Sequence, residues 1–190
     1  MSTPEGEAPA GERILDATLA LLARDGVAGV SVRTVAAEAG VARGLAGYYF
    51  NNKSGLISAA LRRIGSQDFD LVQPAADGVD PVEHLRCCLR QAVDPSYLDP
   101  AYLSLRLQLW SLAGVDQSYA EINRAAQRRY LRGLADLMSA ARPDLEPSEV
   151  GRRSTDILII QNGVWLTAVL IEDGEAVDRA VGRCEALAFG

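Results

Sequence analysis

The chain has 190 residues, of which 48% are apolar and 6% aromatic, a composition typical of a soluble globular protein. It has no run near the ~18 consecutive apolar residues of a membrane span, and its acidic start lacks the apolar stretch of a signal peptide. The net charge is −6, but residues 1–65 hold seven basic and six acidic side chains, whereas residues 66–190 hold twelve and nineteen. The N-terminal third is therefore the less acidic part, and any non-specific affinity of it for nucleic acid should be modest and strongly salt-dependent. Three cysteines without a pairing framework favour a reducing, cytoplasmic location.

Every predicted element is a helix, because no segment shows the sustained alternation of a strand. We expect residues 1–10 to form a disordered tail and a first helix to run from Gly11 to Asp25, with Gly26 as its stop. Ser31 can then cap a second helix over residues 32–39 by accepting a hydrogen bond from an N-terminal amide.

The stretch from Ser31 to Gly55 predicts a helix-turn-helix followed by the start of a further helix. Ala36 is small enough for a close helix crossing, Gly40 supplies the positive φ of the turn, and Val41 fills the corner. The next helix, over residues 42–50, has a small tip and an aromatic side chain that suit the major groove of DNA. We expect its buried residues to be Ala46, Tyr49 and Phe50, and its outward residues to be Arg43, Gly44, Leu45, Gly47 and Tyr48. An ordinary helical hairpin is the alternative at this point.

The residues that follow have the character of a phosphate contact. Asn51 and Asn52 form a polar turn, and Lys53, the only lysine of the chain, stands at the start of the next helix. Lysines and helix N-termini both bind phosphate.

These residues resemble the TetR family of one-component bacterial transcriptional repressors, over about Gly11 to Leu61. The resemblance is carried by Gly26-Val27, Ser31-Val32-Arg33, Ala36, Gly40-Val41-Ala42-Arg43-Gly44 and the run from Tyr48 through Tyr49-Phe50-Asn51-Asn52-Lys53-Ser54-Gly55 to Leu56. Two positions depart from the family pattern. Ala42 stands where serine or threonine is usual, which removes a side-chain cap and a phosphate contact, and Gly47 stands where a longer residue is usual.

The resemblance implies residue roles at the DNA. The side chains expected to face base edges are Arg43, Gly44, Leu45 and Tyr48, with Arg33 reaching in from the preceding helix. Those expected to hold phosphates are Ser31, Thr34, Tyr49 and Lys53.

Further helices are predicted along the rest of the chain. One begins near Ser54 and continues to about Val72, followed by a loop over residues 73–79. Asp80-Pro81 and Asp99-Pro100 are N-cap and first-turn pairs that mark the next two helix starts, and Asp116 marks a third. The expected helices cover residues 81–93, 100–112, 117–141, 147–171 and 175–188. This gives an all-α fold of about nine helices, with residues 11–55 as a DNA-binding domain and 56–190 as a regulatory and dimerisation domain.

The last two predicted helices are apolar on more than one face, which leaves surplus apolar surface. We interpret them as a homodimer interface, a four-helix bundle across a two-fold axis. Its predicted residues are Ile157, Ile160, Val164, Ala168, Val177, Val181 and Cys184. An intrachain core is the alternative.

Aromatic and polar residues are interspersed between the predicted DNA end and the predicted dimer end. The resemblance implies an effector pocket in this region, and an apolar cavity with a few polar groups is how such pockets are built. Its predicted lining is Phe69, Tyr102, Gln108, Trp110, Asn123, Gln161 and Trp165. For each single aromatic residue, core packing is the alternative.

The sequence does not favour an enzyme or a metal protein. It has one histidine and no G-x-S-x-G, P-loop or Cys-x-x-Cys motif. His84, Cys87 and Cys88 share a helix, but no fourth ligand is evident, so we predict no metal and no cofactor.

The interpretation that follows is a regulator that binds a palindromic DNA operator as a homodimer. A small, largely apolar effector is expected to release it by favouring a state in which the helix from Ser54 swings. Two alternatives remain: a DNA-binding protein of the same type controlled by a protein partner instead of an effector, and a helical enzyme or carrier. No membrane partner is expected.

Overall fold

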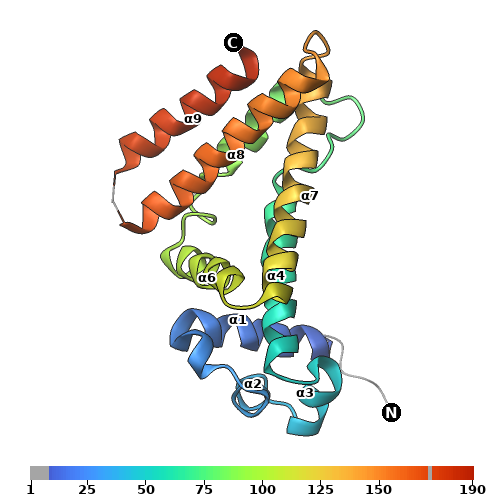
Figure 1. Ribbon diagram of the computed structural model, residues 1–190, viewed down its shortest axis with the longest axis vertical. Helices are drawn as coiled ribbons and strands as arrows, with labels where there is room; N and C mark the ends of the chain where they lie inside the picture. Colours follow the sequence, from blue (N-terminus) through green and yellow to red (C-terminus); the bar gives the residue numbers. More distant parts are fainter. Residues whose placement is uncertain (1–8, 171–172) are drawn as a thin grey trace.

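The computed structural model describes residues 9–170 and 173–190, and every regular element within these ranges is a helix (Figure 1). The predicted all-α fold class is therefore confirmed. The predicted tail lies outside the described residues as far as residue 8, and so does Ile171, the predicted end of the eighth helix. No helix in the described ranges is long and apolar enough to cross a membrane. The elements are α1 (Ala10–Gly29), α2 (Val32–Glu38), α3 (Arg43–Phe50), α4 (Lys53–Asp70), α5 (Pro81–Gln91), α6 (Pro100–Ser111), the 3₁₀ turn η1 (Leu112–Gly114), α7 (Gln117–Ala141), α8 (Pro147–Leu170) and α9 (Gly174–Phe189).

The predicted caps form. The carboxylates of Asp80, Asp99 and Asp116 each accept a hydrogen bond from a backbone amide in the first turn of the helix that follows. Gly26 has the predicted positive φ, 68°, and its ψ of −173° is not helical, so it interrupts the helix as predicted; a short helical turn to Gly29 follows it and is included in α1.

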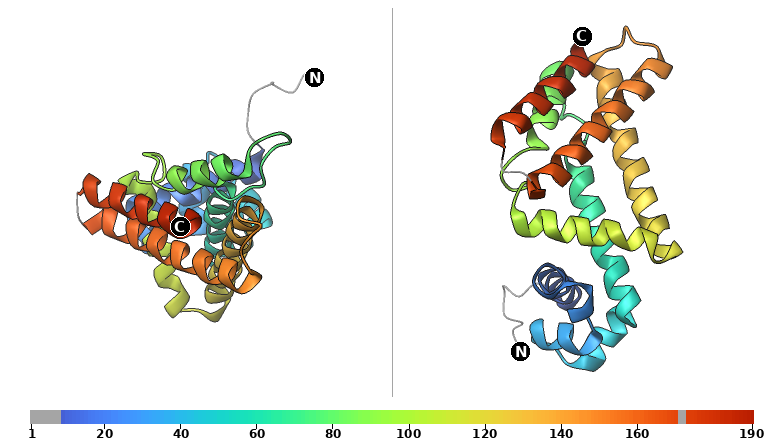
Figure 2. Two further views of the ribbon diagram at one scale, coloured as in Figure 1. Left: turned by 90° about the horizontal axis from the view of Figure 1, so that it is seen from above. Right: turned by 60° about the vertical axis from the view of Figure 1, so that its left-hand side comes forward.

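The molecule is elongated, with α1–α3 forming a head at one end (Figures 1 and 2). α4 leaves the head and runs beside the long helix α7 toward the opposite end, where α8 and α9 lie antiparallel to each other. We call α1–α3 the head and α5–α9 the body, with α4 running from one to the other. α4 ends at Asp70, two residues before the predicted end, and the connection over residues 71–80 lets the chain return to α5.

The core of the head does not consist of head residues alone. The first turns of α4 contribute Leu56, Ile57, Ala60, Leu61 and Ile64, and the body contributes side chains from α6, η1 and α7. Those body residues are Leu105, Leu109, Leu112 and Tyr119. The head is therefore packed against the body through one continuous apolar cluster, and about 25 cal/mol per Å² of buried apolar area favours keeping them together.

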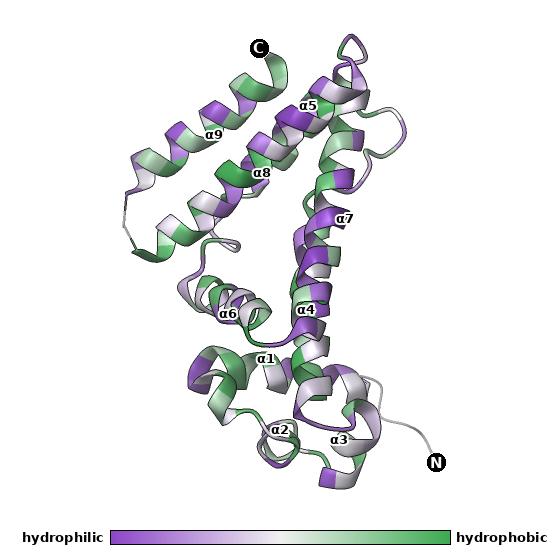
Figure 3. Ribbon diagram, viewed as in Figure 1, coloured by the Kyte–Doolittle hydropathy of each residue, from purple (hydrophilic) through white to green (hydrophobic). Residues whose placement is uncertain are grey.

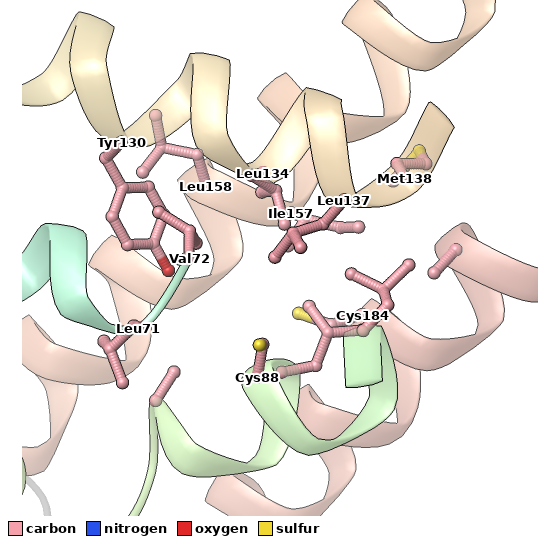
Figure 4. Packing of buried hydrophobic residues seen from close by; sticks show 14 of the residues in the cluster. Leu71, Val72, Cys88, Tyr130, Leu134, Leu137, Met138, Ile157, Leu158 and Cys184 are labelled. Atoms are coloured by element: carbon pink, nitrogen blue, oxygen red, sulfur yellow. The ribbon is translucent and has the colours of Figure 1, made fainter. Parts of the chain in front are cut away.

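A second core lies in the body, between the end of α4, α5, α7, α8 and α9 (Figure 4). In that view Leu134, Leu137 and Ile157 lie together at the centre, and Tyr130 lies beside Val72. Figure 3 shows why the other side of α7 stays at the surface, since hydrophilic residues extend along it.

The close approach of α7 to the end of α4 depends on Gly133. A Cβ at this position would lie 2.7 Å from the Cγ2 of Val72 and 2.9 Å from its carbonyl oxygen. Gly133→Ala should therefore lower the free energy of unfolding by about 1–3 kcal/mol, because backbone as well as side chain must move. Urea unfolding followed by circular dichroism measures this difference.

The matched control is Gly151→Ala, in α8, where a new Cβ would meet no atom within 4 Å. This variant should be neutral or gain up to ~1 kcal/mol from helix propensity. Equal stability of the two variants would contradict the close packing of α7 on α4.

Candidate nucleic-acid interface and body sites

The start of α2 is held by a reciprocal cap. The Thr34 amide donates to the Ser31 hydroxyl oxygen at 3.1 Å, and the Ser31 amide donates to the Thr34 hydroxyl oxygen at 2.9 Å. The predicted cap by Ser31 is confirmed, and Thr34 also bonds the Gly29 carbonyl at 2.8 Å. Ser31 and Thr34, two of the four residues predicted to hold phosphates, thus also stabilise the start of α2.

The turn between α2 and α3 has the predicted geometry. Gly40 has φ 63°, Ala36 is buried, and the Val41 amide donates to the Ala36 carbonyl at 3.0 Å. The sequence did not indicate the contribution of Arg13, whose guanidinium reaches from α1 to the carbonyls of Ala39 and Gly40 at 3.1 and 3.3 Å. These bonds tie the turn to the first helix, and no motif signals a contact 26 residues away in the sequence.

α3 presents the predicted outward face. Ala46 is fully buried beneath it, whereas its other side carries exposed side chains, and Tyr48 retains 84% of its accessible surface. At Gly44 a Cβ would meet nothing within 4 Å, so the tip of the helix is open. Of the residues predicted to face outward, Arg43, Gly44, Leu45 and Tyr48 are exposed, whereas Gly47 is only partly exposed.

The prediction that Tyr49 is buried is wrong, since 49% of its surface is exposed. Its ring packs instead beside Gly11 at the start of α1 and edge-on to Tyr48, with ring centroids 5.7 Å apart. Phe50 is partly buried against the head core. Tyr49 therefore lies on the rim of the head, half exposed.

The start of α4 is capped by a side chain and packs closely against the end of α3. The Asn52 side-chain oxygen accepts from the Gly55 amide at 3.0 Å, and a Cβ at Gly55 would lie 1.9 Å from the Phe50 carbonyl oxygen. Lys53 is the first residue of α4 and is exposed. The Tyr119 hydroxyl of α7 bonds the Ser54 hydroxyl at 3.1 Å, so the body contacts α4 one residue from Lys53.

Basic side chains on this surface are available to a ligand. Across the described ranges, Arg33, Arg43 and Lys53 form no ion pair, whereas Arg24 on another side of the head pairs with Asp25 and Glu38. Unpaired cations beside an open helix face form an electropositive surface. As predicted from the family pattern, Ala42 provides no side-chain hydrogen bond to the amides at the start of α3.

The seven residues predicted to line one effector pocket do not line a common cavity, although Tyr102, Trp110 and Trp165 all lie around one buried arginine of α6. Phe69 lines a cavity of about 290 Å³ between α4, α5 and α7, together with Val72, Pro81, His84 and Leu137. Trp110 and Asn123 line a groove of about 500 Å³ beside Asn162. Gln108 bonds Ser104 and lies next to Gly26 of the head. Of the remaining three, Gln161 and Trp165 are buried in the interior of the body, whereas Tyr102 is partly buried.

Arg106, which no sequence motif marks, lies at the centre of the interior. Arg106 of α6 is completely buried and paired with Asp68 of α4, with its Nη1 2.9 Å from the carboxylate. Burial raises the pKa of Asp68, and the neighbouring guanidinium opposes that rise. Tyr130 donates to the side-chain oxygen of Gln161 at 2.8 Å close by, and burial raises the pKa of Tyr130 as well.

His84 and the two adjacent cysteines do not form a common site. The His84 Nε2 lies 2.9 Å from the Gln73 carbonyl and 3.6 Å from the buried Cys88 Sγ, but Cys87 is exposed and joins neither contact. Within the ranges that the structure describes, no three histidine, cysteine or acidic side chains gather as metal ligands would.

The residues that α8 and α9 expose differ from those predicted for the dimer interface. Ile157, Val164 and Cys184 are buried by the chain's own helices, so they are not available to a second copy. Ile160, Ala168, Val177 and Val181 are partly buried and lie between α8 and α9 or beside that groove. The large apolar side chains that α8 exposes are Ile159, Leu166, Val169 and Leu170.

Two family models match the chain. The model described as "Bacterial regulatory proteins, tetR family" matches residues 14–60, and that described as "BetI-type transcriptional repressor, C-terminal" matches residues 81–188. The HTH-type transcriptional regulator BetI 1 of Chromohalobacter salexigens is 28% identical over 170 residues, covering 88% of this chain and 83% of that protein. BetI of Stenotrophomonas maltophilia is 26% identical over 162 residues, covering 84% and 81%.

Solved structures have the same fold. A transcriptional regulator from Pseudomonas aeruginosa PAO1 aligns with a TM-score of 0.79 at 23% identity, covering 93% of this chain and 87% of that one. A regulator from Saccharomonospora viridis, solved in complex with choline, aligns with a TM-score of 0.71 at 21% identity, covering 93% and 94%. These proteins are regulators and not enzymes. The BetI-type model alone spans more than half of the sequence, and the chain therefore belongs to the TetR family of bacterial transcriptional regulators, with a C-terminal part of the BetI type.

Proposed function

We propose that this TetR-family chain binds a palindromic operator as a homodimer in the cytoplasm, represses transcription there, and is released by a small, largely apolar effector. In this proposal residues 11–55 are the DNA-binding domain and residues 56–190 the regulatory domain. The observation that carries it is the open face of α3, flanked by the unpaired cations of Arg33 and Lys53.

The exposed residues of α3 support base recognition. Arg43 is the first residue of the helix, so its long side chain starts from the end that enters a major groove. A bidentate arginine–guanine contact discriminates against a wrong base by about 1–3 kcal/mol. Gly44 adds no bulk, and Leu45 and Tyr48 offer apolar surface for thymine methyl groups and sugars.

Phosphate contacts are proposed on both sides of α3. Lys53 and the N-terminal amides of α4 favour an anion on one side, and Ser31 and Thr34 at the start of α2 lie on the other. Tyr49, on the rim, can donate its hydroxyl to the backbone of the duplex.

The exposed face of α8 supports dimerisation. Ile159, Gly163, Leu166 and Leu170 recur at helical spacing along one side, and Gly163 is open to solvent. A glycine inside an exposed helix costs about 1 kcal/mol relative to alanine, and close approach of a second helix is a reason to keep it. A two-fold axis here would give two heads, which read half-sites about 34–36 Å apart.

The cavity over Phe69 supports release by an effector. Its lining is mostly apolar, and its volume of about 290 Å³ is near the lower end of ligand pockets. Phe69 and Val72 belong to the end of α4 and the residues just after it, and the other end of the same helix carries Lys53. An occupant that displaces the end of α4 favours a different head position, provided that it binds that state more tightly.

Two substitutions separate base contacts from phosphate contacts. Arg43→Ala should lose most of the preference for the selected operator over a scrambled duplex, because it removes a base-edge donor. Lys53→Ala should weaken both duplexes by the same factor and reduce the salt dependence, because it removes one phosphate contact. Fluorescence anisotropy at several salt concentrations, with an operator selected from random DNA by the wild type, measures both. The opposite pattern in the two variants would refute these roles.

The dimer is tested by charge on the exposed face of α8. The wild type should sediment as a dimer at micromolar concentration, and the double variant Ile159→Glu with Leu166→Glu should sediment as a monomer of unchanged helical content. Val115→Glu, at a residue 79% exposed outside the helices of the proposed interface, is the matched control and should remain a dimer. A monomeric wild type, or a dimeric double variant, would rule out this interface.

A thermal-shift screen tests the effector. Small, largely apolar compounds should include some that raise the melting temperature and lower operator affinity. Ala75→Trp places a large ring at the rim of the cavity and should abolish the shift while leaving operator binding intact. If no compound binds, or if Ala75→Trp has no effect on those that do, control by a protein partner becomes the better account.

A further inference from the structure

The buried guanidinium of Arg106 is surrounded by aromatic rings from two helices. Its Cζ lies 3.8 Å from the centroid of the Trp165 ring, 5.1 Å from that of Tyr102 and 5.6 Å from that of Trp110. All three distances are within the ~6 Å over which an aromatic face attracts a cation. Three rings around one cation form an aromatic cage, which we define as Tyr102, Trp110 and Trp165.

Two of these rings are held by contacts that do not involve Arg106. The Trp165 Nε1 donates to the Ala92 carbonyl at 2.8 Å. The Tyr102 hydroxyl donates to Asp68 at 3.3 Å, and its ring packs edge-on against Tyr97 with centroids 6.0 Å apart. The cage should therefore keep its shape when the guanidinium is removed.

The cage also has a built-in counter-charge. The Asp68 carboxylate, itself buried, accepts hydrogen bonds from both terminal nitrogens of Arg106. The Arg106 Nε, by contrast, is buried and has no hydrogen-bond partner among the described residues. The site thus supplies aromatic faces and one negative charge, which suits a cation that needs no further hydrogen bonds.

A compact quaternary ammonium ion has this character, because it is attracted to aromatic faces and donates no N–H. We propose that Arg106 is a tethered cation that occupies a quaternary-ammonium cage, so that it is the residue that excludes such ions from this part of the body. The cage is separate from the cavity over Phe69 that is proposed for the effector, and neither the cage nor its occupant depends on DNA binding.

Electrostatics explains the exclusion. A free cation entering beside Arg106 would place two positive charges next to one carboxylate in a region of low dielectric, where like charges repel strongly. Truncation to alanine removes more heavy atoms than tetramethylammonium brings, and it leaves Asp68 without a partner. Arg106→Ala should therefore bind a free cation beside Asp68, in the place that the guanidinium occupies in the wild type.

The test uses the full-length chain and tetramethylammonium chloride, with sodium chloride at equal ionic strength as the reference. Arg106→Ala should gain a thermal shift with the probe and bind it at least about tenfold more tightly than the wild type in calorimetry. Arg106→Lys, which keeps a tethered cation, should resemble the wild type. Adding Trp165→Leu to Arg106→Ala should reduce the gained affinity, because the nearest ring is lost.

A buried, unpaired Asp68 could unfold Arg106→Ala, and this case is also informative. Refolding of the variant by the probe, followed by circular dichroism, would support the cage. The double variant Arg106→Ala with Asp68→Asn has no unpaired charge, and it should bind the probe more weakly than folded Arg106→Ala but more tightly than the wild type. The proposal is overturned if neither variant binds the probe better than the wild type, or if the wild type binds it equally well.

None of these measurements uses DNA. Loss of operator binding by the wild type would therefore refute the proposed function and leave the cage intact. A variant that fails to bind the ion would refute the cage and leave the proposed function intact.

Discussion

The head of this protein is completed by its body. Leu105 and Leu109 of α6, with Tyr119 of α7, are buried in the same apolar cluster as the residues of α1 and the first turns of α4. Removing the body would expose this surface to water, so the orientation of the helix-turn-helix depends on where α6 and α7 lie. The position of a DNA-reading helix is in this way a property of the whole chain.

The same arrangement gives physical routes from the body to α3. α4 carries Phe69 at one end and Lys53 at the other, and it packs along α7 through the contact that Gly133 permits. The Tyr119–Ser54 hydrogen bond joins α7 directly to the first turn of α4. A change in body packing can reach the head only by moving these elements, because a close-packed core does not deform continuously.

Local signals in the sequence predicted much of this structure. Asp80-Pro81 and Asp99-Pro100 indicated helix starts within a residue, and Gly40 with Val41 indicated the turn that leaves Arg43 and Tyr48 exposed. Tertiary contacts were beyond such signals. α8 is apolar nearly all round, so periodicity could not decide that Ile157 faces inward and Ile159 outward. An arginine among leucines suggests a surface position, and only the fold brings Asp68 to Arg106, 38 residues away.

The central claim is that head and body share one core, and hydrogen exchange of a single variant tests it most directly. Leu109→Ala removes a side chain of α6 from the shared cluster and should cost about 2–5 kcal/mol. If the core is shared, the amides of α1 should lose protection by the same free energy as those of α6, because they open as one cooperative unit. Unchanged protection of α1, with loss confined to α6, would contradict the account.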